Sequence, residues 1–236
     1  MNSTPVDPHD HHLSIDDALE FLDTLKYDDG VAVDILGSAG DGIDWLRERG
    51  VVHDPCEPAL EALEVPGPAA DRALGHIRSV RAALRELVDA TAERRPPSRK
   101  AVETVNRAMA ARQRLVLTVG SPDDGRCLTL DHRHEGDPLD DALGRIAESI
   151  AREVAGGDAD RIRVCANEQC RWAFYDSSRT GRRRWCDMAS CGNRAKAARH
   201  RARVRASHPA TAPGTATTRA TATTPAPATR PAAVSG

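Results

Sequence analysis

The chain has 236 residues, of which 40% are hydrophobic and 29% charged, and only three Trp, two Tyr and two Phe are present. This length suits one full-sized domain with a small added module. No segment reaches the roughly 20 apolar residues that cross a bilayer, and the N-terminus lacks the basic start and apolar run of a signal peptide. We therefore expect a cytoplasmic protein with no membrane partner.

Charge is distributed unevenly along the chain, although the net charge is only −2. Residues 1–160 carry 18 basic and 32 acidic side chains, whereas residues 161–205 carry 13 basic and 3 acidic ones. Arg219 and Arg230 are the only charged residues after position 205. This polarity predicts an acidic body joined to a basic module that has an anionic partner.

Helices dominate the acidic part of the chain. Residues 1–12 are polar and aperiodic, so we expect disorder there and expect His9, His11 and His12 to be solvated. Ser14 and Asp17 form a capping pair for a first helix near 14–26. Apolar spacings of three and four predict further helices. These span about 41–49, 71–91 and 98–112, and a last one begins at Pro138 after Asp137 and stops at Gly156-Gly157.

The helix over 71–91 is amphipathic, and its arginines are predicted to face water: Arg72, Arg78, Arg81 and Arg85. Residues 115–119 and 127–130 read as two strands around an SPDDGR turn, the only hairpin predicted in the acidic half. After about residue 207 the chain is almost wholly Ala, Thr and Pro, which predicts a disordered tail.

The expected fold is therefore mainly α, and its domains follow from these boundaries. A disordered stretch over 1–12 precedes a helical domain over 13–157 with a small β-hairpin. Gly156-Gly157-Asp158 is the linker to a small module over 160–205, and 206–236 is the tail.

Four cysteines in this module have the spacing of a zinc site. Cys165-x4-Cys170 and Cys186-x4-Cys191 form two pairs, each able to occupy one edge of a tetrahedron around a structural Zn²⁺. The residues between them predict a hairpin, with 171–175 as one strand and 182–185 returning. So few large apolar side chains lie here that the metal should supply much of the folding free energy. A disulfide framework or iron is the alternative, and Cys56 and Cys127 are read as ordinary small residues.

Two residues after the last cysteine are candidates to support the site. A helix is predicted to begin at Cys191, whose thiolate the free N–H groups would stabilise. Gly192 would let the backbone approach the sulfur, and Asn193 would bond a sulfur or tie the turn to the hairpin. Simple helix capping is the competing explanation for both.

Cations cluster on the predicted hairpin and on the helix that follows. Phosphate is their expected partner, so we expect DNA binding, with the helix in the major groove and Ala195, Ala198 and Ala202 packed against the hairpin. The alternatives are neutralisation of a tetrathiolate charge of −2, a solvated helix face, or binding of RNA or an acidic protein. The candidate nucleic-acid contacts are Arg179, Arg182, Arg183, Arg184, Arg194, Lys196, Arg199, Arg201 and Arg203.

An enzyme is not expected. The sequence has no nucleophile motif, phosphate loop or HExxH, and four cysteine ligands leave no open metal position for a water molecule. His132 and His134 are read as surface histidines rather than as a catalytic or metal-binding pair.

The module resembles the CGNR zinc finger of bacterial proteins through a set of residues whose spacing and types agree together: Cys165, Cys170, Trp172, Phe174, Asp176, Arg179, Trp185-Cys186, Met188 and Cys191-Gly192-Asn193-Arg194-Ala-Lys196. Residues 14–155 resemble the ABATE domain through Leu19-Glu20-Phe21-Leu22-Asp23-Thr24 and Trp45-Leu46. The family usually has Asn where this chain has Asp23. The resemblance implies a zinc-binding, stress-related transcription regulator whose N-terminal domain senses a signal or self-associates into a homo-oligomer.

Overall fold

A computed structural model describes residues 13–28, 30–52, 57–111, 114–119, 128–133 and 136–207. The expectations for His9, His11, His12, Cys56, Cys127 and His134, for the His132 side chain, and for the tail beyond Ser207 lie outside the described residues and side chains. By their contacts, the described residues up to Lys196 form one compact unit, and Ala197–Ser207 belong to a second. Among the helices that the structure describes, none is long and apolar enough to span a bilayer.

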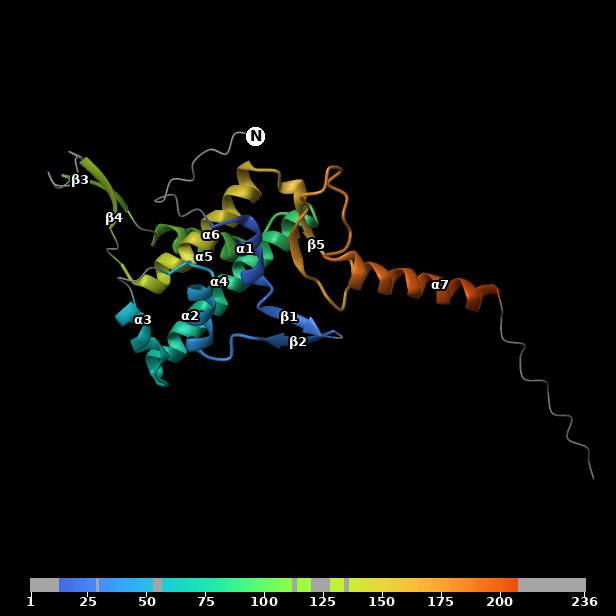
Figure 1. Cartoon of the computed structure of the whole chain (residues 1–236), viewed down its shortest axis with the longest axis horizontal. Coiled ribbons are helices and arrows are strands. Elements are labelled where there is room, and N and C mark those ends of the chain that lie inside the picture. The colour runs from blue at the N-terminus through green and yellow to red at the C-terminus, as the bar shows by residue number, and fades with distance from the viewer. Residues whose placement is uncertain are drawn as a thin grey trace, which may run out of the picture. The chain divides into compact units, whose positions relative to one another are not determined.

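In the part of the chain that the structure describes, seven α-helices carry the fold (Figure 1). Serine or aspartate caps start several of them, because their side-chain oxygens accept the free N–H groups of the first turn. Ser14 Oγ accepts the N–H of Asp17 (3.1 Å), and Asp137 Oδ1 accepts the N–H of Leu139 (2.8 Å). Both caps were predicted. The helices are α1 Ile15–Leu22, α2 Ala39–Glu48, α3 Glu57–Glu64, α4 Pro68–Ala92, α5 Arg99–Ala110, α6 Pro138–Gly156 and α7 Asn193–Ser207.

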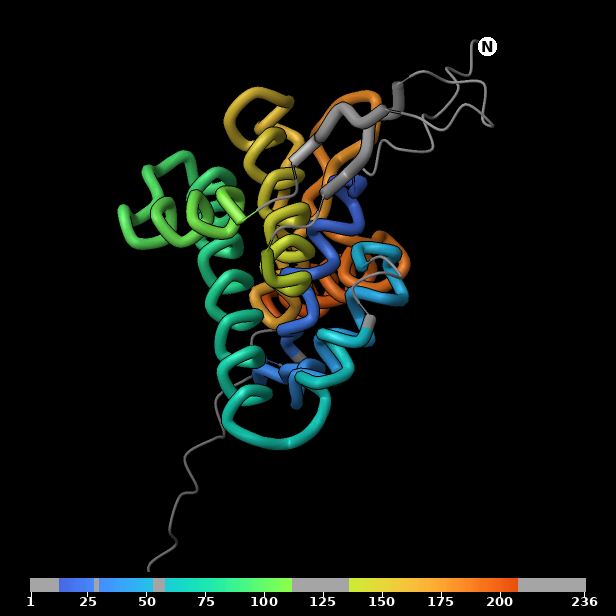
Figure 2. Tube along the Cα trace, turned by 90° about the vertical axis from the view of Figure 1, so that its left-hand side faces the viewer, coloured from blue at the N-terminus to red at the C-terminus, as the bar shows by residue number. Residues whose placement is uncertain are grey.

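The core of the first unit lies where α1, α4 and α6 pack side by side (Figures 1 and 2). Each helix contributes aliphatic side chains at three- and four-residue spacing that are at most 1% exposed, such as Leu19 on α1, Leu84 on α4 and Ile146 on α6. Helix α5 packs on α4 and α6 from outside. With few aromatic residues available, burial of these aliphatic groups is the main stabilising term.

Two hairpins accompany the helices. Strands β3 (Arg114–Val119) and β4 (Leu128–Arg133) pair antiparallel, as predicted, with Leu117 opposite Leu130. The prediction of a single hairpin in this half was wrong, because β1 (Leu25–Asp28) also pairs antiparallel with β2 (Val31–Asp34). Helix α1 consequently ends at Leu22 rather than near 26, and α3 was not predicted at all.

The third hairpin belongs to the cysteine-bearing module. Strand β5 (Ile162–Val164) pairs antiparallel with β6 (Ala173–Tyr175), with Arg163 opposite Phe174. The expected partner of 171–175 was 182–185, and this pairing was wrong. Residues 182–185 instead run beside the first cysteine pair, where the Arg184 carbonyl accepts the N–H of Ala166 (2.8 Å).

The arginines of α4 are the largest departure from the predicted helix faces. Arg72 is exposed as expected, but Arg81 is only 4% exposed. Its guanidinium donates to both carboxylate oxygens of Asp34 (2.8 and 2.6 Å) and to Thr24 Oγ1 (2.8 Å). Arg85 is also largely covered, with a side chain 17% exposed. Helix α4 therefore has a charged face turned toward the β1–β2 hairpin.

Candidate metal centre and basic surface

The first cysteine pair lies in a tight turn between β5 and β6. The N–H of Cys165 donates to the Trp172 carbonyl (2.8 Å), which extends the strand pairing by one bond. The carbonyl of Asn167 accepts the N–H groups of Cys170 (2.8 Å) and Arg171 (3.0 Å), and Arg171 has a left-handed backbone with φ of 52°. This reversal brings Cys170 back beside Cys165.

The second pair is held by a capped helical turn. Asp187 Oδ2 accepts the N–H of Ser190 (2.7 Å), which starts a π-helical turn over Met188–Gly192 that runs directly into α7. Cys186 precedes the cap and Cys191 lies within the turn. The prediction that Cys191 sits near a helix N-terminus is confirmed, with the start three residues earlier at Met188.

The four sulfur atoms lie within 4.8 Å of one another. Cys186 Sγ is 3.7 Å from Cys170 Sγ and 3.8 Å from Cys191 Sγ. Zinc with Zn–S bonds of about 2.3 Å in a tetrahedron places its sulfur ligands about 3.8 Å apart. A disulfide would need about 2.05 Å, and all four cysteines are free. The donor set and its spacing therefore fit Zn²⁺ and leave no ligand position for substrate.

The pKa values of the cysteine thiols show how burial and mutual repulsion affect their ionisation. Burial raises the pKa of Cys170 to about 11. Burial, together with the negative charges of Cys165 and Cys170, raises the pKa of Cys186 further. At Cys191 burial opposes ionisation, but hydrogen bonds from Asn167 and the neighbouring thiols outweigh it and lower the pKa. All four thiols could ionise together only if a cation offset the repulsion between the thiolates, which is what a metal ion would supply here.

The residues around the sulfurs have different tasks from those expected. Asn193 donates to the Ala189 carbonyl (3.0 Å), so it ties the helical turn rather than a sulfur. Asn167, which sequence reasoning missed, donates from Nδ2 to Cys191 Sγ (3.5 Å). Gly192 is buried, and a Cβ there would lie 2.7 Å from Met188 Sδ. The end of the exposed Met188 side chain therefore occupies the space that a larger residue at position 192 would need, and it would have to move aside.

A buried carboxylate organises the basic loop between β6 and Cys186. Asp176 is fully buried and accepts the N–H groups of Ser178 (3.0 Å) and Arg183 (2.7 Å). These bonds hold the pKa of Asp176 below its usual value despite its burial. Arg161 Nη1 reinforces the loop by donating to the carbonyls of Asp176 (2.7 Å) and Ser178 (2.8 Å). These hydrogen bonds to Asp176 and from Arg161 hold the backbone of the loop that carries Arg179 in place.

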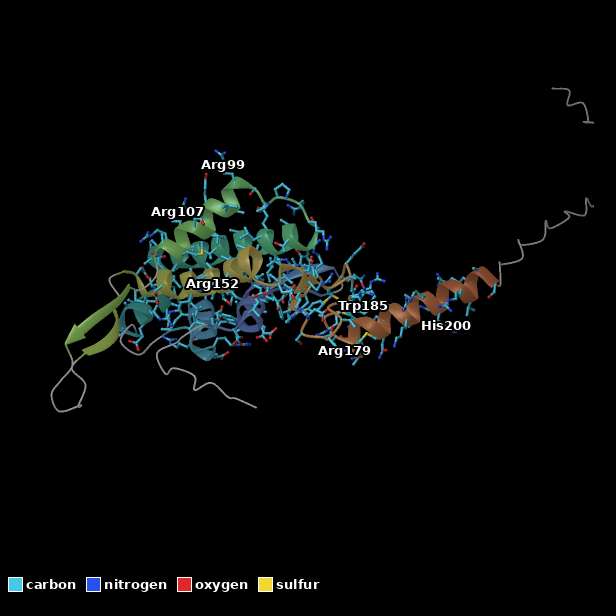
Figure 3. All side chains as sticks on the ribbon, turned by 90° about the horizontal axis from the view of Figure 1, so that it is seen from above. Arg99, Arg107, Arg152, Arg179, Trp185 and His200 are labelled. Carbon is cyan, nitrogen blue, oxygen red and sulfur yellow. The ribbon has the colours of Figure 1, made fainter. Side chains whose placement is uncertain are left out.

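The candidate nucleic-acid residues fall into two groups. On the loop, Arg179 lies at the outer edge of the module (Figure 3), and Arg182 is exposed. Arg183 covers the Phe174 ring at 4.9 Å and donates to the Cys186 carbonyl, and Arg184 lies 5.4 Å from the Trp185 ring. The second group is exposed on α7, which has no buried residue: Arg194, Lys196, Arg199, Arg201 and Arg203.

Exposure of α7 corrects one expectation. Ala198 and Ala202 were predicted to pack against the hairpin, but both are exposed, and only Ala195 is half-buried.

The module also contacts the helical part of the first unit through residues that were not predicted. Asp23, the C-cap of α1, is 4% exposed, and its two carboxylate oxygens lie 3.0 and 3.1 Å from the N–H of Ala173. Arg85 Nη2 donates to the Arg171 carbonyl (2.5 Å), and Arg171 Nη2 lies 3.1 Å from Asp89 Oδ2. Ile162 and Ala173 are buried in the common core, so β5 and β6 fold as part of this unit.

Comparison with known protein families agrees with this architecture. Residues 161–204 match the model of the CGNR zinc finger, within which the four-cysteine cluster suggests one zinc ion. Residues 16–157 match the ABATE model, which is described as "Putative stress-induced transcription regulator". A search of curated proteins gave no match. The ABATE match covers more than half of the chain, and the chain therefore belongs to the ABATE family and carries a CGNR zinc finger behind that domain.

Proposed function

We propose that the chain is a transcription regulator whose zinc finger binds duplex DNA. Cys165, Cys170, Cys186 and Cys191 hold one structural Zn²⁺, and the finger folds around it. The observation that carries the proposal is the excess of exposed cations. Residues 161–205 contain 13 basic and 3 acidic side chains, and one of those acids, Asp176, is fully buried. A tetrathiolate zinc site of charge −2 neutralises only a small part of this excess.

Helix α7 supports DNA as the partner through the placement of its arginines. At 3.6 residues per turn, Arg199 and Arg203 lie on one side of the helix, and Arg201 and Arg205 lie on the opposite side. A helix lying in the major groove has a phosphate backbone on each flank, so two opposed rows of guanidinium groups suit that position. Ala198 and Ala202 lie between the rows, where small side chains permit close approach.

The arginines of the loop between β6 and Cys186 add further phosphate contacts, and two of their side chains are pre-ordered. Arg179 and Arg182 are exposed and have no ion pair in the described chain, so both can reach phosphates. Arg183 and Arg184 are engaged with aromatic rings and with the Cys186 carbonyl, which pre-orders their side chains. Such contacts fix the register of a protein on DNA, whereas any base reading would fall to one or two arginines of α7.

In this proposal the ABATE domain senses a signal or forms a homo-oligomer, and the protein acts on DNA in the cytoplasm. A finger that binds RNA or an acidic protein is the competing function. The same surface charge would serve it, but two opposed cation rows on one helix favour duplex DNA.

The test is fluorescence anisotropy of a labelled random duplex, titrated with the zinc-loaded full chain at several salt concentrations. With about six phosphates neutralised, log affinity should fall against log salt with a slope near −5. Chelation should abolish binding and rebinding of zinc should restore it. The variant Arg107→Gln on α5, which projects from the ABATE domain (Figure 3), is the matched control and should bind as the wild type does. Preferential binding of RNA or of an acidic protein over duplex DNA would overturn the proposal.

A further inference from the structure

A hollow of about 200 Å³ lies beside helix α4, between the end of α1, strand β1 and the first cysteine turn of the finger. Its walls are mostly apolar, with Leu22, Leu25, Tyr27 and Ala82 among the lining residues. Its polar lining consists of Arg78, Arg81, Arg85, Asp89 and Arg171. This combination of an apolar wall with several guanidinium groups is the usual composition of a small-ligand site.

The charges around the hollow do not balance. Arg81 is matched by Asp34, and Arg85 and Arg171 share Asp89 at 3.1 Å each. The remaining carboxyl is Asp23, 3.4 Å from Arg85 Nη1, and burial raises its pKa to about 8, against the opposing effects of the Ala173 N–H and Arg85. Near neutral pH the site therefore has four guanidinium groups against two ionised carboxylates.

Arg171 is the arginine within reach of a ligand. The side chains of Arg78 and Arg171 are each 42% exposed, whereas that of Arg81 is 5% exposed. The Arg78 guanidinium is already engaged, because its Nη2 donates to the Leu36 carbonyl (2.7 Å) and its buried Nε lies 3.0 Å from Asp34 Oδ2. An anion at the end of the hollow beside the cysteine turn could accept bonds from Arg171.

We propose that this hollow binds a small organic monocarboxylate with one ring or a short alkyl chain. The carboxylate lies at Arg171, and the apolar part lies against Leu22 and Tyr27. A planar guanidinium fork matches a carboxylate. The apolar lining disfavours inorganic phosphate, which would have to leave most of its hydration shell for a wall without donors.

The position of Arg171 gives this site a route to the finger. Arg171 directly follows the cysteine Cys170, and its carbonyl accepts a hydrogen bond from Arg85, which also lines the hollow. A ligand held by Arg171 therefore bonds the same turn that presents Cys170. The ligand-binding experiment contains no DNA, so its outcome tests the ligand site separately from the DNA-binding proposal.

The experiment is a calorimetric titration of the zinc-loaded full chain with benzoate and with hexanoate. Benzamide, a neutral mimic of benzoate, and inorganic phosphate serve as comparison ligands. We expect saturable binding of at least one carboxylate and at least tenfold weaker binding of benzamide and phosphate, because benzamide lacks the charge that pairs with a guanidinium and phosphate lacks the apolar part.

Two variants and two matched controls locate the site. Ala82→Leu should fill the hollow and Arg171→Gln should remove the charge that binds the carboxylate, each weakening carboxylate binding about tenfold or more. Ala62→Leu on exposed α3 and Arg107→Gln on α5 make the same changes elsewhere and should bind as the wild type does. Thermal unfolding checks that each variant is folded. Absence of binding by both carboxylates, equal binding of benzamide, or unchanged binding by the folded Ala82→Leu variant would overturn the proposal.

Discussion

Replacement of Asp23 by Asn should make the stability of the protein less dependent on pH. Asp23 is buried beneath the finger, where its carboxyl accepts the N–H of Ala173 and lies 3.4 Å from Arg85 Nη1. Burial raises its pKa from 3.8 to about 8. The Ala173 N–H and Arg85 oppose this shift, while the negative charges of Glu20 and Asp89 add to it.

The sign of the effect follows from proton binding. Between pH 4 and pH 8 the folded chain holds the Asp23 proton and the unfolded chain has lost it, so the free energy of unfolding falls as pH rises. Above the pKa of Asp23 in the folded protein, this contribution to the free energy of unfolding is fully lost. One pKa unit corresponds to about 1.4 kcal/mol, so between pH 5 and pH 8 the wild type should lose about 4 kcal/mol relative to Asp23→Asn. Asparagine keeps the acceptor for the Ala173 N–H and cannot ionise.

Urea unfolding of both zinc-loaded proteins at each pH unit from 5 to 8 measures this difference. Protonation of the zinc ligands affects both proteins alike, so it cancels in the comparison. Asp16→Asn, at an exposed position on the same helix, is the control and should give a small, nearly constant difference. A constant difference between the two proteins across this range, or a wild type that gains stability relative to Asp23→Asn as pH rises, would refute the reasoning.

Three further substitutions test the packing and the metal site. Cys186→Ser removes one of four sulfur ligands and should abolish stoichiometric zinc binding, measured by metal analysis after gel filtration, and lower the thermal stability. Gly192→Ala should cost less than about 1 kcal/mol in urea unfolding, because the end of the exposed Met188 side chain, 2.7 Å from the added Cβ, can move aside, and a larger loss would contradict this packing. Arg81→Met should cost about 3 kcal/mol by leaving Asp34 without its bidentate partner, and wild-type stability in this variant would contradict the assigned ion pair.

The parts of the fold that depend on neighbouring residues could be predicted from the sequence. The caps at Ser14 and Asp137 are local, because each side chain bonds an N–H two or three residues away. The closeness of Cys165 and Cys170 is likewise local, because both lie within one turn between β5 and β6. The two caps and the gathering of the four cysteines were predicted with the correct residues.

The features of the fold that were not predicted depend on contacts between residues far apart in the sequence. Arg81 lies four residues after Ile77 and three before Leu84, so periodicity places it on the buried face of α4 and only its residue type pointed to water. The carboxylate that matches its charge, Asp34, is 47 residues earlier. Leu25 continues the apolar repeat of α1 but belongs to β1, because pairing with β2 competes with the helix. Strand β6 pairs with β5 and not with 182–185, since Asp176 holds the Arg183 N–H away from the sheet. None of these contacts has a signature in the local sequence.

The role of Asp23 in joining the ABATE domain to the finger was missed for the same reason. Its partner, the N–H of Ala173, is a backbone group 150 residues away. A backbone donor leaves no residue-type signal, so only the position of Asp23 within the family motif pointed to it.

DNA contact by helix α7 is the central claim, and the salt dependence of binding tests it most directly. Arg199 and Arg203 lie on one side of the helix, so the double variant Arg199→Gln/Arg203→Gln removes one cation row. If both arginines neutralise phosphates, the slope of log affinity against log salt should become shallower by about 2 relative to the wild type, at equal zinc content. An unchanged slope and affinity in the zinc-loaded double variant would contradict the assignment of α7 to DNA.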